Sequence, residues 1–206
     1  MAIKDDREYR NLGNIEIRQA EGAEPSFFVE GYASTFEPYK LLTIDGVDYY
    51  ERIDPQAFEN ADMSDVVFLR DHEGRVLART KNGSIELHID DKGLWTRTDL
   101  GLTSAAREMF EDIQSRNYSQ MSFSFTVDKD DYEEDTHTRV IRSFRKLYDI
   151  SAVAFPANPG TDIGVSYRDY FNGVIEAEKA ERLEAERRQK AIERLKLRLR
   201  LEEEGK

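Results

Sequence analysis

The sequence predicts a mainly β protein of the α+β class: an antiparallel β-barrel, closed or nearly closed, flanked by a few helices. The first observation is that short alternating or apolar segments recur between about residues 14 and 155, separated by turn signals. The second is that residues 173–206 change in composition and are typical of one charged helix. Roughly seven or eight strands with one or two packed helices favour a barrel over a doubly wound sheet.

The N-terminal half supplies three predicted strands and a short helix. Residues 14–18 alternate in polarity and are predicted to be a strand, and residues 27–33, after a turn signal, are predicted to be a second strand that could form a hairpin with the first. Residues 37–50 are predicted to be a tyrosine-rich connection. Asp54 is a suitable helix cap and is followed by proline, so a short helix is expected to begin there. Residues 66–69 are a short apolar run of the kind found in buried strands.

The second half is predicted to contain a hairpin, a helix and three further strands. Residues 84–99 alternate around an Asp-Asp-Lys-Gly turn, which is a strong hairpin signal. Thr103 is predicted to cap a helix whose apolar residues share one face. The segment 121–127 is a strand with apolar and hydroxyl side chains on opposite faces. A return strand is expected around residues 139–141, and residues 147–155 form a nearly continuous apolar strand.

The change in composition divides the chain into a domain of residues 1–172 and a charged helical tail of residues 173–206. The tail holds ten Lys/Arg and nine Asp/Glu, a net charge of +1, and the whole chain carries −12, which leaves −13 for the body. Glu–Arg and Glu–Lys pairs spaced i,i+4 support the tail as a helix, but its apolar stripe is too irregular for a coiled coil. We expect this helix either to dock on a partner or to be a solvated extension.

Composition excludes several classes of function. A body of charge −13 repels phosphate backbones, so no nucleic-acid partner is expected. No apolar run is long enough for a membrane helix, and the first residues lack the apolar stretch of a secretory signal. The chain has no cysteine and three scattered histidines, which predicts no metal site. Glycine-rich phosphate-binding motifs are also missing, so no cofactor is expected.

Three polar residues in apolar or turn-rich surroundings are the candidates for chemistry: His72, Ser122 and Asp149. A hydroxyl that attacks, an imidazole that takes its proton and an acid that orients the imidazole are the parts of acyl-transfer catalysis. Pattern alone leaves simpler interpretations open. Ser122 is also compatible with a solvent-facing strand residue, Ser124 fits the same pattern, and His72 is compatible with an exposed loop residue.

Asp149 is the least easily dismissed of the three, because it lies within an apolar strand. An unpaired carboxylate in such surroundings would cost several kcal/mol. We therefore expect Asp149 to have a partner, either a histidine N–H, a lysine, an arginine or a backbone N–H.

Four groups of segments, spread over about residues 14–165, carry a resemblance to a known family. They are residues 29–36 with 51–58, residues 68–73 with 77–79, residues 121–125, and residues 149–160. In this order they resemble the prohead (capsid maturation) proteases of tailed phages, the HK97-like family. That family is similar in fold to herpesvirus assembly proteases, in which a β-barrel is flanked by helices.

The resemblance implies a serine endopeptidase in which Ser122 is the nucleophile and His72 the base. Asp149, where the family usually has glutamate, is then the third member. The implied substrates are the scaffold region of the major capsid protein precursor and the protease itself, inside a prohead that assembles in the bacterial cytoplasm. Backbone N–H groups must stabilise the oxyanion, and the Asn158–Gly160 turn is one candidate source whose position the sequence does not define. Glu73, Ala78 and Ser124 also depart from the usual residues of the family.

Two other functions are compatible with the sequence. The chain is also interpretable as a non-catalytic capsid-assembly scaffold built on a protease-like barrel, although a scaffold has no need to keep Ser122 and His72. A metal hydrolase fits less well, because so few ligands are present.

Overall fold

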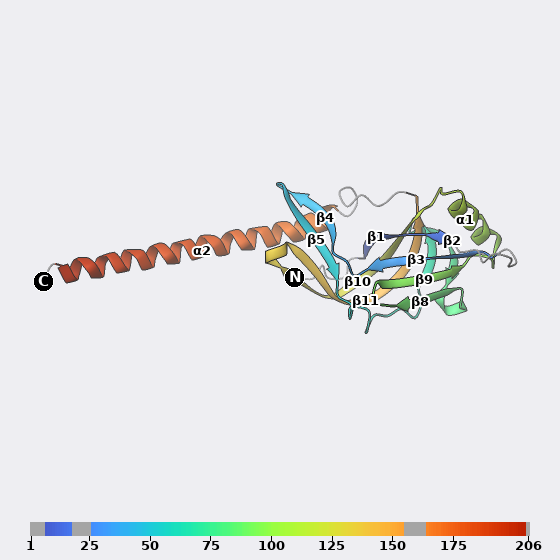
Figure 1. The fold of residues 1–206 in the computed structure, drawn as a ribbon, viewed down its shortest axis with the longest axis horizontal. Helices are drawn as coiled ribbons and strands as arrows, with labels where there is room; N and C mark the ends of the chain where they lie inside the picture. Colours follow the sequence, from blue (N-terminus) through green and yellow to red (C-terminus); the bar gives the residue numbers. More distant parts are fainter. Residues whose placement is uncertain (1–6, 18–25, 155–163, 205–206) are drawn as a thin grey trace. The chain divides into compact units, whose positions relative to one another are not determined.

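The computed structural model describes residues 7–17, 26–154 and 164–204, and its strands fall into two sheets (Figure 1). The larger, seven-stranded sheet has the order β1-β10-β11-β5-β4, with β6 beside β11 and β7 beside β6. Its strands are β1 (Glu8–Asn14), β4 (Tyr39–Ile44), β5 (Val47–Ile53), β6 (Val67–Arg70), β7 (Glu73–Arg79), β10 (Gln120–Glu133) and β11 (Thr138–Val153). The smaller sheet has the order β2-β3-β9-β8, with β2 (Glu16–Ile17), β3 (Phe28–Thr35), β8 (Ile85–Ile89) and β9 (Gly93–Asp99).

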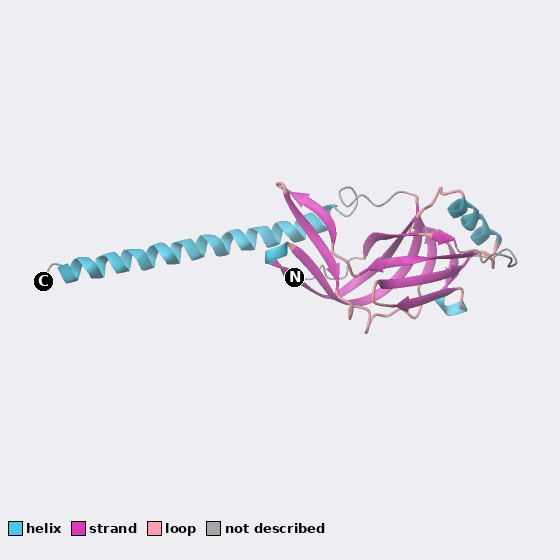
Figure 2. Cartoon of the chain, viewed as in Figure 1, coloured by secondary structure: helices cyan, strands magenta, loops and turns pink. Residues whose placement is uncertain are grey.

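Helices are fewer than strands, but one of them is very long (Figure 2). The described residues contain two α-helices, α1 (Ser104–Gln114) and α2 (Gly164–Glu204), and two short 3-10 turns, η1 (Thr80–Asn82) and η2 (Glu134–Thr136). Helix α1 begins as predicted, because the Thr103 hydroxyl accepts a hydrogen bond from the backbone N–H of Ala106 at 3.1 Å. Its four buried residues share one face: Ala106, Met109, Phe110 and Ile113.

The prediction of a closed antiparallel barrel is wrong. The two sheets are not closed into a barrel, and the larger one is mixed. Strand β11 is antiparallel to β10 but parallel to β5 through residues 138–141 and parallel to β6 through residues 149–152. The alternation of polarity along a strand is the same in parallel and antiparallel pairs, so the sequence pattern did not reveal these crossovers.

Two local predictions in the N-terminal half are also wrong. Residues 37–50 are not a plain connection, because β4 and β5 form a hairpin there with its turn at Asp45 and Gly46. No helix starts after Asp54. Its carboxylate accepts a hydrogen bond from the N–H of Gln56 at 3.0 Å and so caps a series of turns.

A single apolar core joins the two sheets. It includes Val29 and Leu94 from the smaller sheet and a group of three phenylalanines from the larger one. The ring centroids of Phe123 and Phe125 are 4.8 Å apart, as are those of Phe125 and Phe144. The core therefore fixes which face of β10 carries its apolar side chains, and the hydroxyl side chains of that strand must lie on the opposite face.

Strand β1 passes close to β3 at Gly13. A Cβ atom on Gly13 would lie 1.7 Å from the carbonyl oxygen of Tyr32. This oxygen is a backbone atom, so no change of side-chain rotamer can relieve the clash. Gly13→Ala is therefore expected to lower the free energy of unfolding by about 2–3 kcal/mol, the upper range for overpacking, as measured by urea denaturation. Gly173→Ala is the control, because a Cβ there meets nothing within 4 Å. Equal stability of the two variants would count against this close approach.

The chain divides into two compact units, Met1–Ile163 and Gly164–Lys206. The second unit consists of α2, which begins at Gly164 rather than near residue 173 as the change in composition suggested. Of the predicted i,i+4 pairs, Glu186 and Lys190 lie 3.8 Å apart, and both are exposed. Within the described ranges, no helix has both the length and the apolarity needed to cross a membrane.

Candidate active site

The candidate residues come from neighbouring strands of the larger sheet. In β10, Ser122 and Ser124 lie on the face opposite the phenylalanine core. In the antiparallel register with β11, Ser122 is opposite Ser151 and Ser124 is opposite Asp149. The two strands therefore gather three hydroxyls and one carboxylate on a single face of the sheet.

His72 reaches this face from the tight turn between β6 and β7. Arg70 pairs with Glu73 across the hairpin, so Asp71 and His72 are its two central residues. Both have positive φ values, 49° and 62°, as a type I′ turn requires. Such angles are unfavourable for residues other than glycine, and strain of this kind is concentrated at functional sites. The backbone N–H of Asp71 donates to the carbonyl oxygen of Ala152 at 3.0 Å, which ties the turn to β11.

The three predicted site residues meet in one chain of contacts. His72 Nδ1 lies 2.6 Å from Asp149 Oδ1, and His72 Nε2 lies 2.6 Å from Ser122 Oγ. Asp149 is fully buried, Ser122 is 1% exposed, and the His72 side chain is 16% exposed. A solvent-facing role for Ser122 is therefore excluded, and the imidazole bridges the hydroxyl and the carboxylate.

The Asp149 carboxylate is stabilised in its ionised form. Burial raises its pKa, but the hydrogen bond and positive charge of His72, with hydroxyl hydrogen bonds from Ser124 and Ser151, together lower the pKa below its ordinary value. An ionised carboxylate only accepts hydrogen bonds, so His72 Nδ1 must carry the hydrogen. Nε2 is then unprotonated in the neutral imidazole and is free to accept from Ser122.

Ser122 has a second acceptor within reach. Its Oγ lies 2.9 Å from the carbonyl oxygen of Arg10 in β1, and one hydroxyl hydrogen serves only one acceptor at a time. Donation to Nε2 prepares the oxygen for attack, whereas donation to Arg10 holds it inactive.

Sequence reasoning missed three residues around this site. Arg7, just before β1, contacts both Asp149 and Ser124 through its guanidinium group. The ring of Tyr9 meets the His72 ring edge-on, with centroids 4.7 Å apart. The Ser151 hydroxyl donates to Asp149 Oδ1 at 2.7 Å. Alternation along β11 would have placed Ser151 beside Asp149, but no local signal marked Arg7 or Tyr9.

The other two histidines of the chain lie away from this arrangement. His88 is exposed on β8, and His137 Nδ1 lies 3.1 Å from the hydroxyl of Tyr132 at the tip of the β10–β11 hairpin. The Asn158–Gly160 turn lies outside the described residues. Among the residues that the structure describes, no group of three or more His, Cys, Asp or Glu side chains is arranged to hold a metal ion.

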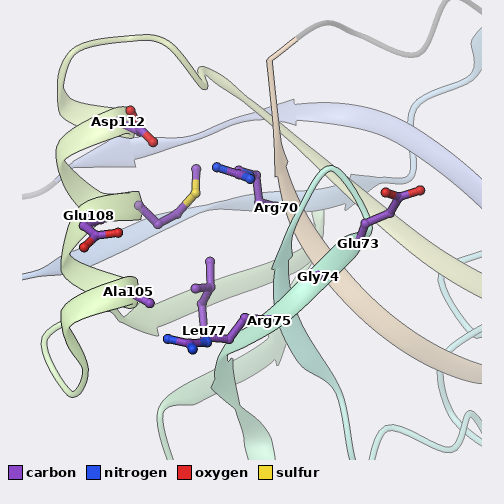
Figure 3. Close-up of a pocket in the computed structure, with 9 residues that line it drawn as sticks. Arg70, Glu73, Gly74, Arg75, Leu77, Ala105, Glu108 and Asp112 are labelled. Atoms are coloured by element: carbon purple, nitrogen blue, oxygen red, sulfur yellow. The ribbon is translucent and has the colours of Figure 1, made fainter.

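A hollow of about 230 Å³ lies between α1 and the β6–β7 hairpin (Figure 3). Its lining consists of Arg70, Glu73, Gly74, Arg75, Leu77, Ala105, Glu108, Met109 and Asp112. The rim thus carries charges of both signs, and the apolar part comes from Leu77 and Met109. The hollow borders the hairpin that bears His72, but His72, Ser122 and Asp149 do not line it.

Comparison with known proteins identifies the family of the chain. Residues 13–173 match the model of a family described as caudovirus prohead serine protease. The chain is 32% identical to the prohead protease of Enterobacteria phage HK97 over 152 residues, which are 72% of this chain and 63% of that relative. The chain thus spans somewhat less than two thirds of the relative's length. No solved structure gives a significant match. Because the family model covers most of the sequence, including the strands and the turn that hold the site, the chain belongs to the caudovirus prohead serine protease family.

Proposed function

We propose that the chain is a serine endopeptidase that processes the capsid precursor of a tailed phage. Ser122 is the nucleophile, His72 the general base and then acid, and Asp149 the residue that orients His72. The observation that carries this proposal is the continuous series of contacts from Asp149 through His72 to Ser122, with 2.6 Å on each side of the imidazole. Membership of the prohead serine protease family supports it.

Acylation uses both nitrogens of the imidazole. Ser122 Oγ attacks the scissile carbonyl carbon while its proton passes to His72 Nε2, and the ionised Asp149 stabilises the imidazolium that forms. The tetrahedral intermediate collapses with cleavage of the C–N bond, and Nε2 gives its proton to the departing amine. The products of this half are the amine and an ester of Ser122.

Deacylation repeats the sequence with water. His72 Nε2 takes a proton from a water molecule as its oxygen attacks the ester carbonyl. Collapse of the second intermediate breaks the bond to Ser122 Oγ, which recovers a proton from His72. The carboxylic acid leaves, and the three side chains return to their starting protonation.

The burial of Ser122 adds a step to this cycle. With 1% of the residue exposed, Oγ meets a scissile carbonyl only after neighbouring chain has moved. Tyr9 and the carbonyl of Arg10 are the contacts from β1 that border His72 and Ser122. We infer that the described state is a closed one, which opens when substrate binds.

The proposed partners are the scaffold region of the major capsid protein precursor and a second copy of this chain, cleaved inside the prohead. The relative is itself called a prohead protease, and the acidic body of the chain favours basic substrates over nucleic acid. Residues 173–206 are a candidate docking element for scaffold helices; a solvated extension is the other interpretation of this charged segment.

The burial of Ser122 also favours one alternative function, that of a non-catalytic protein. A scaffold protein that keeps a protease-like fold without catalysis would tolerate a hydroxyl that solvent barely reaches. The family and the hydrogen bonds of His72 favour the enzyme, because a scaffold has no need of an imidazole aligned between a serine and an aspartate.

Co-expression of the chain with its cognate capsid precursor, followed by intact-mass analysis of both proteins, tests the proposal. Wild type is expected to shorten the precursor or itself, and Ser122→Ala is expected to leave every chain at full length. Assembly of shells with full-length chains in both cases would favour the scaffold function. Equal cleavage by both would show that another residue, with Ser124 the next candidate, is the nucleophile.

A further inference from the structure

The Asp149 carboxylate receives four donors, two on each oxygen. Oδ1 accepts from His72 Nδ1 at 2.6 Å and from the Ser151 hydroxyl at 2.7 Å. Oδ2 accepts from the Ser124 hydroxyl and from Nη2 of Arg7. The proposed function uses only the first of these contacts, and the two on Oδ2 require an explanation of their own.

The donors on Oδ2 fix the rotation of the carboxylate. The last torsion of an aspartate is broad and nearly two-fold, so donors on one oxygen alone hold its plane only loosely. Arg7 binds Ser124 Oγ as well, at 3.0 Å from Nε and 2.8 Å from Nη2, so the serine and the arginine hold each other. The guanidinium carbon lies 4.5 Å from the centre of the Tyr148 ring, which supports the arginine from β11.

Arg7 also supplies charge. Asp149 is fully buried, whereas the Arg7 side chain is 37% exposed, so the arginine brings a partly hydrated cation to a carboxylate that solvent does not reach. Within the described part of the chain, Arg7 is the permanently charged cation in contact with Asp149. Without it, the imidazole of His72 would face an uncompensated negative charge, which favours the imidazolium, the form that cannot accept the proton of Ser122.

We propose that Arg7 and Ser124 are positioning residues of the protease, which lock the second oxygen of Asp149 so that the first stays aligned on His72. This inference rests on the proposed function, since it assigns a role to Asp149 in catalysis. Arg7 contributes both charge and geometry, whereas Ser124 contributes geometry alone.

The groups that face this centre come from four parts of the fold. Around Asp149 they are Arg7 before β1, Ser124 on β10, Ser151 on β11 and His72 in the β6–β7 turn. Around His72 they are Tyr9, Ser122, Asp149 and the charged neighbours in its own hairpin, Asp71 and Glu73. Among these groups, Arg7 is the cation that stays charged at every working pH. Its loss therefore removes a permanent positive charge from the site.

The test is the rate of labelling by a fluorophosphonate, which phosphonylates the serine oxygen with loss of fluoride and needs no knowledge of the natural substrate. The second-order rate constant is measured against pH for the full chain. Arg7→Ala is expected to lower the limiting rate roughly 10- to 100-fold, the effect of one hydrogen bond to a charged group, and to move the acid limb to higher pH. Arg7→Lys and Ser124→Ala are expected to lower the limiting rate with the acid limb in place.

Arg75→Ala is the matched control, because Arg75 is an exposed arginine of the neighbouring strand β7 that lines the hollow and not the candidate site. Its rate constant and acid limb are expected to equal those of wild type. If Arg7→Ala does not fold, the limiting rates of Arg7→Lys and Ser124→Ala alone test the positioning role. Rates within twofold of wild type in all three variants and an unmoved acid limb in Arg7→Ala, with labelling lost in Ser122→Ala, would overturn the positioning role and leave the protease intact. Labelling that persists in Ser122→Ala would overturn the proposed function itself.

Discussion

Replacement of Asp149 by asparagine is expected to lower the rate of Ser122 acylation by about 10⁴-fold, the loss seen when the orienting acid of a serine protease triad becomes an amide. The reason lies in the donors around the side chain. Arg7 can only donate, so the amide oxygen must face Arg7 and Ser124 and the amide NH₂ must face His72. The imidazole then accepts at Nδ1 and carries its hydrogen on Nε2. In that tautomer it cannot take the proton of Ser122.

The measurement is the fluorophosphonate rate constant at neutral pH, with thermal unfolding to check that the variant is folded. Asp65→Asn is the matched control, because Asp65 also accepts from arginine, at 2.5 Å from Arg79, and its other ion pair is with Lys81, outside the site. Its rate is expected to stay within twofold of wild type. A rate for Asp149→Asn within tenfold of wild type would remove Asp149 from the proposed triad.

Much of this arrangement was predictable from residues whose strand pattern is simple. Alternation along residues 121–127 placed Ser122 and Ser124 on one face, opposite the phenylalanines, as the structure has them. The apolar context of Asp149 required a partner, and the structure supplies two of the kinds expected, a histidine N–H and an arginine. The free-energy cost of burying an unpaired carboxylate, rather than any sequence motif, made that expectation specific.

The rest of the site and of the fold depended on contacts between residues far apart in the sequence, which local sequence patterns do not encode. Arg7 is 142 residues from Asp149 in the chain, and its polar surroundings gave no reason to single it out. The parallel contacts of β11 with β5 and β6 turned the expected barrel into a mixed sheet, and the partners of a strand are set by the packing of the whole sheet. The β4–β5 hairpin was missed because tyrosines and charges obscured its alternation.

A second unpredicted feature is a cluster of charged side chains, almost all of their surface buried, that anchors β1, the strand beside Ser122. Arg139 on β11 is 0% exposed and contacts Glu8 of β1, Glu51 of β5 and Asp130 of β10, at 2.9, 2.9 and 2.6 Å. Arg10 of β1 reaches the same Glu51 carboxylate at 2.5 Å. Four strands are thus joined by charges that solvent does not reach, and each charge depends on the others for its neutralisation.

Arg139→Met is therefore expected to lower the free energy of unfolding by about 3–5 kcal/mol, because it strips a cation from carboxylates that stay buried, and to lower Tm by roughly 10 °C. Arg142→Met is the matched control. Arg142 lies on the same strand and pairs with Asp54 and Asp131 at 2.8 and 2.9 Å, but its side chain is 34% exposed, so water screens what the pairs contribute and about 1 kcal/mol or less is expected. Equal losses in the two variants would show that burial does not decide the strength of these contacts.

The pH dependence of this loss has a definite sign. Burial raises the pKa of Glu51, but Arg10 and Arg139 outweigh it and hold the pKa below its ordinary value. A depressed pKa in the folded state stabilises the protein above the unfolded value, about 4.3 for glutamate, and this stabilisation is lost as the pH falls through the lower folded value. The difference in unfolding free energy between wild type and Arg139→Met is therefore expected to be largest at neutral pH and to shrink below roughly pH 4, in urea titrations at a series of pH values. A difference that stays constant down to pH 3 would mean that Arg139 acts through packing of its side chain, not through the charge of the carboxylates around it.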